Sequence, residues 1–519
     1  GAMSRIFVPK DVAAIAAGAN RVAEALTAEA QKRGLAIEIV RTGSRGAFFM
    51  EPLIEVETAF GRVGYREIRA GDVASLFDAD FLSGGDHPAC IGKTDEHPWF
   101  AGQTRLTFAR CGVVDPLSLA DYAAHGGWKG LARAVKLGSL DTLEEVSLSG
   151  LRGRGGAGFP TGVKWKTVAY AEAEQKYVIC NADEGDSGTF ADRMILEGDP
   201  FSLIEGMIIA GFAVGASKGY VYSRSEYPHA NATFAKAIEI ARAAGHLGRS
   251  VDGSGYAFEL ELRVGAGAYV CGEETALMES LEGKRGIVRA KPPLPAVAGL
   301  FGKPTVINNL LSLATIPTIL ADGAQAYADF GMGRSRGTMP IQIAGNVQNG
   351  GLYETAFGLT LGDIVDKIGG GTASGRPVRA VQCGGPLGAY FPPSLFEVPY
   401  DYEAFTAAGG LIGHGGITVF DETVDMAEQA RFAFEFGAAE SCGKCTPCRI
   451  GTVRGRELVE TILAGRATDT TFETLTDLCE TMKFGSLCAL GGFIPYPVTS
   501  SLSHFPEDFR RAPTRAAAE

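Results

Sequence analysis

The sequence predicts a multidomain α/β protein with four consecutive domains, over residues 4–111, 112–330, 331–424 and 425–519. A chain of 519 residues is too long for one hydrophobic core, which favours several domains. Helical and strand patterns alternate along most of the chain, as in α/β layers. From Asp425 onward the pattern turns helical and carries a group of closely spaced cysteines.

The first domain is predicted to be a small α/β unit of the thioredoxin type. A strand at Ile6–Val8 precedes an alanine-rich helix from Asp11 to about Lys32. Three strand-like stretches follow, at Ala36–Arg41, Leu53–Glu57 and Val63–Ile68. A β-α-β-β-β order in so short a span is typical of this class.

The two middle domains differ in their patterns. The strand Tyr177–Cys180 and the helix Ala230–Ala244 represent an alternating order that predicts a mostly parallel sheet. The strand Ile341–Ala344, the helix Thr360–Ile368 and the strand Val378–Gln382 predict a smaller α+β domain.

Charge and hydropathy exclude two classes of partner. The formal net charge of −12 argues against a nucleic-acid surface. The longest apolar run, Met207–Ala216, is too short to span a bilayer, so we expect no direct membrane insertion. We expect a soluble, cytoplasmic protein.

The ten cysteines include one closely spaced run. Cys442, Cys445 and Cys448 form a C-x2-C-x2-C pattern. In a reducing compartment such a run indicates metal ligands rather than disulfides, and each iron of a [4Fe–4S] cluster accepts one protein thiolate. Four thiolates also suit tetrahedral zinc, but structural zinc sites usually pair two separate cysteine knuckles. A radical enzyme of the S-adenosylmethionine type would need a C-x3-C-x2-C triplet. The spacing therefore favours [4Fe–4S].

The fourth ligand must lie elsewhere, because Thr452 occupies the position where a ferredoxin-type run has its fourth cysteine. Cys479 lies in Phe472–Met482, on an apolar helical face that predicts core packing. Cys488 lies in the glycine-bounded stretch Gly485–Gly492, where backbone can fold around a cluster. We expect Cys488 to be the ligand.

A glycine-rich stretch, Arg152–Gly162, contains a formal G-x-G-x-x-G. The dinucleotide fingerprint normally follows a strand, whereas Thr142–Val146 is predicted to be helical; nor does the G-K-[ST] of a P-loop follow. Because glycine has no side chain, the backbone of this stretch can lie directly against a flat ring or a pyrophosphate. Arg154 and Lys164 are expected to supply positive charge for a phosphate. An ordinary glycine-rich turn is the alternative.

Acidic and amide residues follow several predicted strands. Tyr177–Cys180 runs into Asn181–Asp186, at the strand end where open α/β sheets gather ligands. Gly265–Cys271 is predicted to be a further strand, which opens into a carboxylate pair at positions 273–274. The amides at 308–309 follow another apolar stretch. A solvated acidic turn is the alternative.

Together the segments GRGGAGFPTG, NADEGDSGTF, GAGAYVCGEETAL, KPPLPA, INN and SCGKCTPC resemble the FMN-carrying, NADH-oxidising subunit of respiratory NADH:quinone oxidoreductase. The same module occurs in NAD-reducing hydrogenases and in NAD-dependent molybdenum or tungsten formate dehydrogenases. The resemblance covers about residues 112–505. It implies a modified nucleotide-binding α/β domain for FMN and NAD(H), a ubiquitin-like α+β domain, and a C-terminal helical bundle that holds a [4Fe–4S] cluster.

The resemblance also implies site residues. Those on the FMN side are Asn181, Asp183, Glu273, Asn308 and Asn309, with Gly153, Gly156 and Lys164 near the ribityl phosphate. Those that contact NAD(H) are Glu184, Asp186, Glu274, Phe159 and Lys291. Arg154, Gly155, Tyr269 and Gly272, in the same segments, complete the expected cofactor-binding set. Glu184 and Asp186 are the expected catalytic residues.

Three positions depart from the family pattern. Asp186 stands where glutamate is usual, and Thr167 and Leu294 stand where aromatic residues often flank the adenine. We therefore expect stacking on the adenine to be weaker, or to come from other residues.

The first domain resembles the thioredoxin-like [2Fe–2S] domain of a neighbouring subunit. Its loop Arg41–Gly46 has no cysteine, and Cys90 and Cys111 cannot supply four ligands, so we expect a copy without a cluster. This fusion best fits the β subunit of a soluble formate dehydrogenase, whose partners would be a [2Fe–2S] thioredoxin-like subunit and a large molybdenum or tungsten subunit. A hydrogenase subunit comes second and the respiratory subunit third. A non-catalytic electron-transfer or scaffold subunit is the alternative from a different class.

Overall fold

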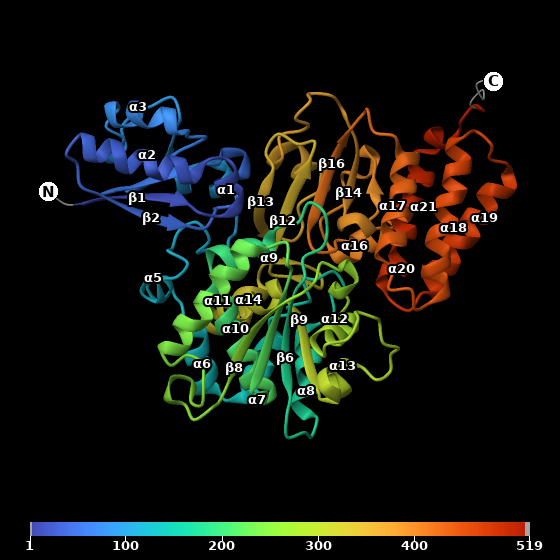
Figure 1. The fold of residues 1–519 in the computed structure, drawn as a ribbon, viewed down its shortest axis with the longest axis horizontal. Helices are drawn as coiled ribbons and strands as arrows, with labels where there is room; N and C mark the ends of the chain where they lie inside the picture. The colour runs from blue at the N-terminus through green and yellow to red at the C-terminus, as the bar shows by residue number, and fades with distance from the viewer. Residues whose placement is uncertain (1–2, 514–519) are drawn as a thin grey trace.

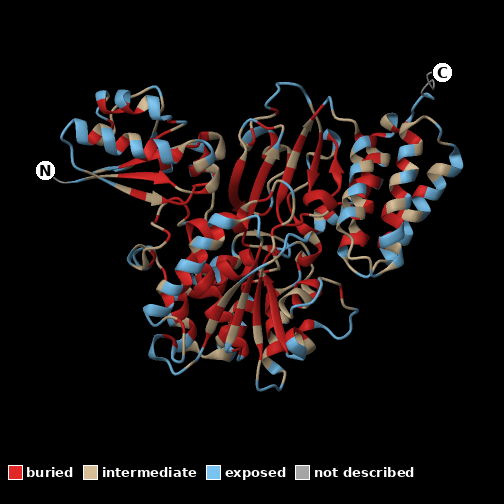
Figure 2. Cartoon of the chain, viewed as in Figure 1, coloured by how far each residue is buried: buried red, intermediate tan, exposed pale blue. Residues whose placement is uncertain are grey.

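The computed structural model describes residues 3–513 and has an α/β multidomain architecture. The N-terminal domain and the C-terminal helical bundle lie at opposite sides, and two sheet-containing layers lie between them (Figure 1). Burial is concentrated in the strands of these two central sheets, whereas the helices of the bundle and of the N-terminal domain have exposed outer faces (Figure 2). Among the described residues, no helix is both long and apolar enough to cross a membrane.

The N-terminal domain has the expected β-α-β-β-β core with two differences. The helix predicted from Asp11 to Lys32 is interrupted at Gly18, whose φ of 107° is left-handed and cannot continue a helix. The strand predicted to reach Ile68 ends at Tyr65, two residues before Glu67, which has a φ of 53°. The sheet order is β2-β1-β3-β4-β5. Its elements are β1 (Ser4–Pro9), α1 (Val12–Ala16), α2 (Ala19–Lys32), β2 (Ile37–Thr42), β3 (Ile54–Thr58), β4 (Gly61–Tyr65), α3 (Val73–Asp78) and β5 (Cys90–Lys93).

The second domain contains a four-stranded parallel sheet of order β8-β7-β6-β9. Its strands are β6 (Tyr177–Ala182), β7 (Lys218–Ser223), β8 (Glu259–Val264) and β9 (Thr305–Asn309). Its principal helices are α6 (Lys129–Leu137), α7 (Ser139–Leu148), α8 (Thr161–Tyr170), α9 (Ala191–Gly198), α10 (Pro200–Val214), α11 (Pro228–Ala243), α12 (Glu274–Leu281) and α14 (Leu310–Asp322). Helix α10 is buried on nearly all sides, which accounts for the longest apolar run of the sequence.

The strand predicted at Gly265–Cys271 is wrong. Strand β8 ends at Val264, and Tyr269–Gly272 forms a short 3-10 turn before α12. Gly267 has a φ of 89°, a left-handed conformation that is incompatible with an extended strand. The carboxylate pair therefore follows a turn and begins a helix.

The third domain has a mixed sheet of order β13-β12-β16-β14-β15. Its strands are β12 (Thr338–Gly345), β13 (Gly351–Ala356), β14 (Val378–Cys383), β15 (Tyr390–Phe391) and β16 (Gly416–Asp421), and α16 is Tyr402–Ala407. The helix predicted at Thr360–Ile368 forms only as a wide π-helical segment, Asp363–Ile368. The bundle consists of α17 (Met426–Glu440), α18 (Thr446–Leu463), α19 (Asp469–Gly485), α20 (Ala489–Phe493) and α21 (Pro495–His504).

The N-terminal domain packs directly on α9. Gly43 and Gly198 approach so closely that a Cβ at Gly43 would lie 2.5 Å from the Gly198 Cα. The Arg193 guanidinium forms ion pairs with Asp11, at 3.0 Å, and with Glu197, at 2.9 Å. All three side chains are buried, so this network joins the first domain to the helix that begins beside the cavity described below.

Candidate functional site

Two connected cavities lie at the carboxyl ends of β6 and β9. The smaller is about 290 Å³ and also touches the third domain and the bundle; the larger is about 490 Å³ and extends along α8. Their shared walls come from the glycine-rich loop, two strand ends, the turn before α12 and the start of α20, namely Gly155, Ala157, Asn181, Gly272, Glu273, Asn309 and Ala489. The two cavities thus form one elongated site where the parallel sheet meets two other domains.

The glycine-rich loop supplies bare backbone to both cavities. Gly153 lines the larger cavity, Gly156 lines the smaller one, and Gly155 lines both. The loop is closed by a hydrogen bond from Gly153 N to Phe159 O at 2.8 Å. A Cβ at Gly155 would lie 3.1 Å from the Asn309 Cβ, so a side chain there would crowd the strand end. This arrangement has room for a flat ring or a phosphate, as the sequence predicts.

Contrary to the prediction from the sequence, Arg154 does not direct its positive charge toward a phosphate in the cavity. Its guanidinium is buried and donates to the Arg336 carbonyl at 2.8 Å and to the Tyr327 hydroxyl at 2.9 Å. It lies over the Phe357 ring as well. The side chain therefore fastens the loop to the third domain, and Lys164, which lines the larger cavity, is the remaining cation of the predicted pair.

Lys164 is held against the sheet. Its Nζ donates to the Ile307 carbonyl at 2.9 Å, and burial lowers the pKa of its ammonium group. Beside it, the Asn308 Oδ1 accepts from the Trp165 Nε1 at 2.7 Å, and the Asn309 Oδ1 caps α14 by accepting from Leu311 N at 2.8 Å. With both oxygens occupied, the amide nitrogens are the groups that remain available as donors.

The acidic turn after β6 contains an unpartnered acceptor. Asn181 donates from Nδ2 to the Gly272 carbonyl at 2.8 Å, and its Oδ1 accepts from Asp183 N at 3.2 Å. The Asp183 Oδ2 is buried and has no hydrogen-bond partner. Burial raises the pKa of Asp183 to about 7, although Arg224 opposes the shift. A buried orphan carboxylate oxygen on the cavity wall fits a ligand that donates an N–H or O–H group, such as FMN.

Asp186 lies on the opposite part of this turn and also lines the smaller cavity. Its Oδ1 accepts from the Tyr269 hydroxyl at 2.7 Å. Burial raises the pKa of Asp186, while the Tyr269 hydrogen bond works against that shift. Tyr269 thus links the turn before α12 to the acidic turn.

Glu184 lines the same cavity, but its carboxylate accepts hydrogen bonds from groups of the protein itself. It accepts from Asp192 N at 2.8 Å, Arg193 N at 3.3 Å and the Tyr227 hydroxyl at 2.8 Å. The carboxylate therefore caps the N-terminus of α9. Burial alone would raise the pKa of Glu184, but hydrogen bonds, above all from His414, outweigh burial and lower it.

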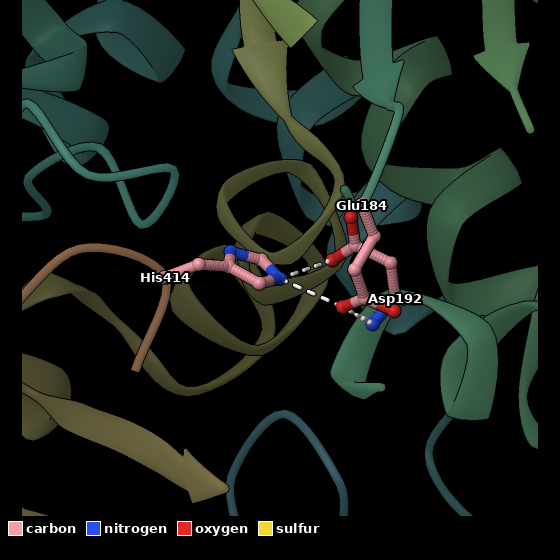
Figure 3. A group of neighbouring side chains, drawn as sticks. All are labelled: Glu184, Asp192 and His414. Atoms are coloured by element: carbon pink, nitrogen blue, oxygen red, sulfur yellow. Dashed lines mark hydrogen bonds and ion pairs between the residues drawn. The ribbon is translucent and has the colours of Figure 1, made fainter. Parts of the chain in front are cut away.

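Reasoning from the sequence missed His414. This buried histidine lies in the glycine-flanked loop before β16 and lines the smaller cavity. Its Nε2 lies 2.8 Å from Glu184 Oε2 and 3.2 Å from Asp192 Oδ1, and Figure 3 shows the ring pointing at both carboxylates. The partners are more than 200 positions away along the chain, so no local motif could reveal the cluster.

The larger cavity combines charge with an apolar wall. Glu273 caps α12, accepting from Thr275 N and Ala276 N at 2.9 Å each. Lys291 pairs with Glu274 and lies 3.8 Å from Glu273. The apolar wall is formed by exposed side chains, Phe159, Val163 and Leu294, with Thr167 beside them. Phe159 therefore places an aromatic ring in this cavity even though positions 167 and 294 have none.

The four predicted ligand cysteines line one small cavity in the bundle, between the end of α17 and the start of α20. Its lining includes Cys442, Cys445, Cys448 and Cys488. Cys479 is not part of that lining; it is 2% exposed and packs in the core of the bundle. Leu487 N donates to the Cys445 Sγ at 3.5 Å. We call this cavity with its four cysteines the cysteine cage.

The cage suits a cluster better than a single ion. A tetrahedral zinc with Zn–S bonds of about 2.3 Å would require sulfurs roughly 3.8 Å apart. Among residues 3–513, the only cluster of at least three histidine, cysteine or acidic ligand atoms lying within 4.8 Å of one another is Glu184, Asp192 and His414. No three of the cage sulfurs therefore lie that close together, which fits ligands to different irons of one cubane better than ligands to one zinc. Burial raises the pKa of Cys488 to about 11, so a bound cation would be needed to hold it as a thiolate.

The cage adjoins the elongated site. Cys488 and Leu487 line both the cage and the larger cavity, while Val270 and Leu490 line both the cage and the smaller cavity. These shared side chains would lie between a ring in the cavity and a cluster in the cage. The arrangement is suited to electron transfer between them.

A cavity for a flat cofactor beside a cysteine cage is typical of an electron-transferring oxidoreductase subunit. Residues 146–318 match the model of the Nuo51 FMN-binding domain, and residues 428–512 match that of the NADH-ubiquinone oxidoreductase-F iron-sulfur binding region. The chain belongs to the family of NADH-quinone oxidoreductase F-type subunits and related hydrogenase subunits. It is an NADH dehydrogenase-type oxidoreductase subunit that uses FMN and a [4Fe–4S] cluster.

Individual relatives support this assignment. The NADP-reducing hydrogenase subunit HndC of Solidesulfovibrio fructosivorans is 45% identical over 78% of this chain and 83% of its own length. An F-type NADH-quinone oxidoreductase subunit of Rhizobium meliloti is 44% identical over 76% of this chain and 94% of its own. A solved NAD⁺-reducing [NiFe]-hydrogenase in the H2-reduced state matches with a TM-score of 0.69 and 30% identity, over 99% of this chain and 85% of the solved chain.

Proposed function

We propose that this chain is the β subunit of an NAD-dependent formate dehydrogenase, in which it exchanges electrons between NAD(H) and a large molybdenum or tungsten subunit. The observation that carries the proposal is the N-terminal thioredoxin-like domain. Its loop at residues 42–46 has no cysteine and is buried against α9 and β13. We infer that this loop holds no cluster and that the domain has a structural role rather than that of an electron relay.

A hydrogenase subunit is the second candidate. The solved NAD⁺-reducing hydrogenase aligns with nearly the whole of this chain, N-terminal domain included, so the fusion is not restricted to one kind of complex. Both candidates share the same reaction at the site described above. They differ in the partner that supplies or receives electrons.

The geometry supports particular roles on the FMN side. Bound FMN supplies hydride acceptance from NADH and release of single electrons. We assign Asp183 to a donor group of the flavin because its Oδ2 has no internal partner. Asn308, Asn309 and Lys164 lie where donors can reach a phosphate or ribityl chain. Glu184 is assigned to positioning rather than to direct contact with nicotinamide, because internal donors occupy its carboxylate.

Other residues are assigned to NAD(H) and to the cluster. Phe159 and Leu294 form the apolar wall for the adenine, and Glu274 with Lys291 lies at the polar side of the same cavity. Asp186 is assigned to the NAD(H) side of the smaller cavity, which it lines. The ligands assigned to [4Fe–4S] are those of the cysteine cage, Cys442, Cys445, Cys448 and Cys488.

The proposal is tested by isolating the native complex through an affinity tag on this chain. The formate dehydrogenase assignment requires molybdenum or tungsten in the complex, a [2Fe–2S] thioredoxin-like subunit, and formate-dependent reduction of NAD⁺. Nickel with hydrogen-dependent reduction of NAD⁺ would replace the proposal with the hydrogenase assignment. NADH-dependent dye reduction by the isolated chain serves as the control that the shared reaction is intact.

A further inference from the structure

His414 joins three segments that line the cavity but come from distant parts of the sequence. Its Nδ1 lies 3.1 Å from the carbonyl of Arg154, in the glycine-rich loop. Its Nε2 faces Glu184, in the acidic turn, and Asp192, in the first turn of α9. The histidine itself belongs to the third domain and lines the smaller cavity, so these contacts cross the domain boundary. Figure 3 shows its approach to Glu184 and Asp192.

We propose that His414 is a positioning residue for the FMN site: as an imidazolium it cross-links the glycine-rich loop, the acidic turn and the start of α9 across the domain boundary. The cross-link fixes the backbone that faces the ring-binding part of the cavity. The inference depends on FMN binding by this family and is independent of which partner subunit completes the complex.

The groups that surround the ring favour a proton on both ring nitrogens. A carbonyl oxygen faces Nδ1 and two carboxylates face Nε2, and all of these groups are acceptors. A neutral ring has one bare nitrogen, which would then face an acceptor without a hydrogen between them.

The surrounding charges support the same state. Burial lowers the pKa of His414, but Asp192 and Glu184 outweigh burial and raise it well above the usual value. Asp186 is a further carboxylate in this cluster, and the His414 charge opposes the rise in its pKa that burial causes. Tyr227 donates to the other oxygen of the Glu184 carboxylate, Oε1. One buried cation therefore balances several carboxylates that would otherwise repel one another.

Removal of the imidazolium should loosen the cavity rather than remove a reacting group. Glu184 keeps its helix N–H donors, whereas Asp192 loses the ion pair that balances its buried charge. The acidic turn and the glycine-rich loop are then no longer joined. We expect the main effect on FMN affinity and on the KM for NADH, with a smaller effect on kcat of the fraction that retains flavin.

The test uses the full chain with His414→Gln, which keeps one donor and loses the charge. Flavin fluorescence titration of deflavinated protein measures FMN affinity, and NADH:dye kinetics measure KM and kcat. We expect FMN to bind at least about tenfold more weakly, which corresponds to about 1.4 kcal/mol. His246→Gln is the matched control, because His246 also pairs with a carboxylate, Asp252, but does not line the cavity.

A double variant and a spectroscopic measurement complete the test. Adding Asp192→Asn to His414→Gln removes the unbalanced charge and should restore part of the FMN affinity. Selective ¹⁵N-histidine labelling of the wild-type chain should show a doubly protonated imidazole at pH 8.5; this measurement decides even if His414→Gln fails to fold. FMN affinity within twofold of wild type in His414→Gln, an equal loss in His246→Gln, or a neutral His414 at pH 8.5 would overturn the proposal.

Discussion

Replacing Cys488 and Cys479 separately with serine distinguishes the two cysteines that lie beyond the closely spaced run. Cys488 lines the cysteine cage together with the three cysteines of that run. Serine offers a hard hydroxyl in place of a soft thiolate, so Cys488→Ser should abolish or strongly perturb the [4Fe–4S] cluster. Because the cage shares Cys488 with the larger cavity, a lost cluster should also stop electron flow from reduced flavin to the partner subunit.

Cys479→Ser should leave the cluster unchanged and lower stability instead. The Cys479 side chain is 2% exposed and lies in α19 on the same buried face as Leu475 and Met482. A hydroxyl placed there without a hydrogen-bond partner costs about 1–3 kcal/mol. Chemical denaturation should therefore show the loss of stability for Cys479→Ser while its iron content stays that of the wild type.

Electron paramagnetic resonance of the dithionite-reduced variants is the deciding assay, with iron analysis of the same samples. The [4Fe–4S] signal should persist in Cys479→Ser and disappear or change in Cys488→Ser. The reverse pattern would refute the assignment and would mean that α19 rearranges to bring Cys479 into the cage.

Three further predictions concern the cavity and its supports. Asp183→Asn should weaken FMN binding by about tenfold or more, as expected for loss of a charge-assisted hydrogen bond of about 1.5–3 kcal/mol, and fluorescence titration checks it. The raised pKa of His414 means that its protonated form stabilises the fold fully below its unfolded-state pKa of about 6.5 and loses this effect as pH rises toward the folded-state pKa. Between these limits the difference in free energy of unfolding between wild type and His414→Gln should shrink by up to about 1.4 kcal/mol per pH unit. Denaturation followed by flavin fluorescence measures it. A difference that does not change with pH would contradict a protonated His414. Arg193→Ala should lower the free energy of unfolding by about 3–5 kcal/mol, because it leaves Asp11 and Glu197 without their cation. Arg454→Ala, in an exposed ion pair, should lower it by less than about 1 kcal/mol. Equal losses in chemical denaturation would show that the buried network does not stabilise the contact between the first domain and α9.

Much of the fold follows from local patterns. The strand at Tyr177–Cys180 and the helix near Ala230–Ala244 were predictable because their apolar spacing matches the period of the element. The strand at Gly265–Cys271 was not, because Gly267 adopts a left-handed conformation that apolar content does not reveal. The break in the N-terminal helix at Gly18 has the same cause.

The candidate site could be predicted in part. The acidic turn and the cysteine run carry their signals in consecutive residues, and the structure places both beside the cavity. An arginine in a glycine-rich loop is a typical phosphate ligand. In the structure, however, tertiary contacts turn the Arg154 guanidinium toward carbonyls of the third domain. His414 has no local signal at all, since its partners come from another domain. Residues whose role depends on contacts between domains are therefore those that the sequence leaves undetermined.

The central proposal is that this chain exchanges electrons between NAD(H) and one [4Fe–4S] cluster through one FMN, with no cluster in the N-terminal domain. Flavin and iron analysis of the purified chain, combined with anaerobic NADH titration, tests it most directly. We expect one FMN and about four irons per chain, with bleaching of the flavin absorbance by NADH. About six irons with a [2Fe–2S] signal, or a flavin that NADH does not reduce, would contradict the account.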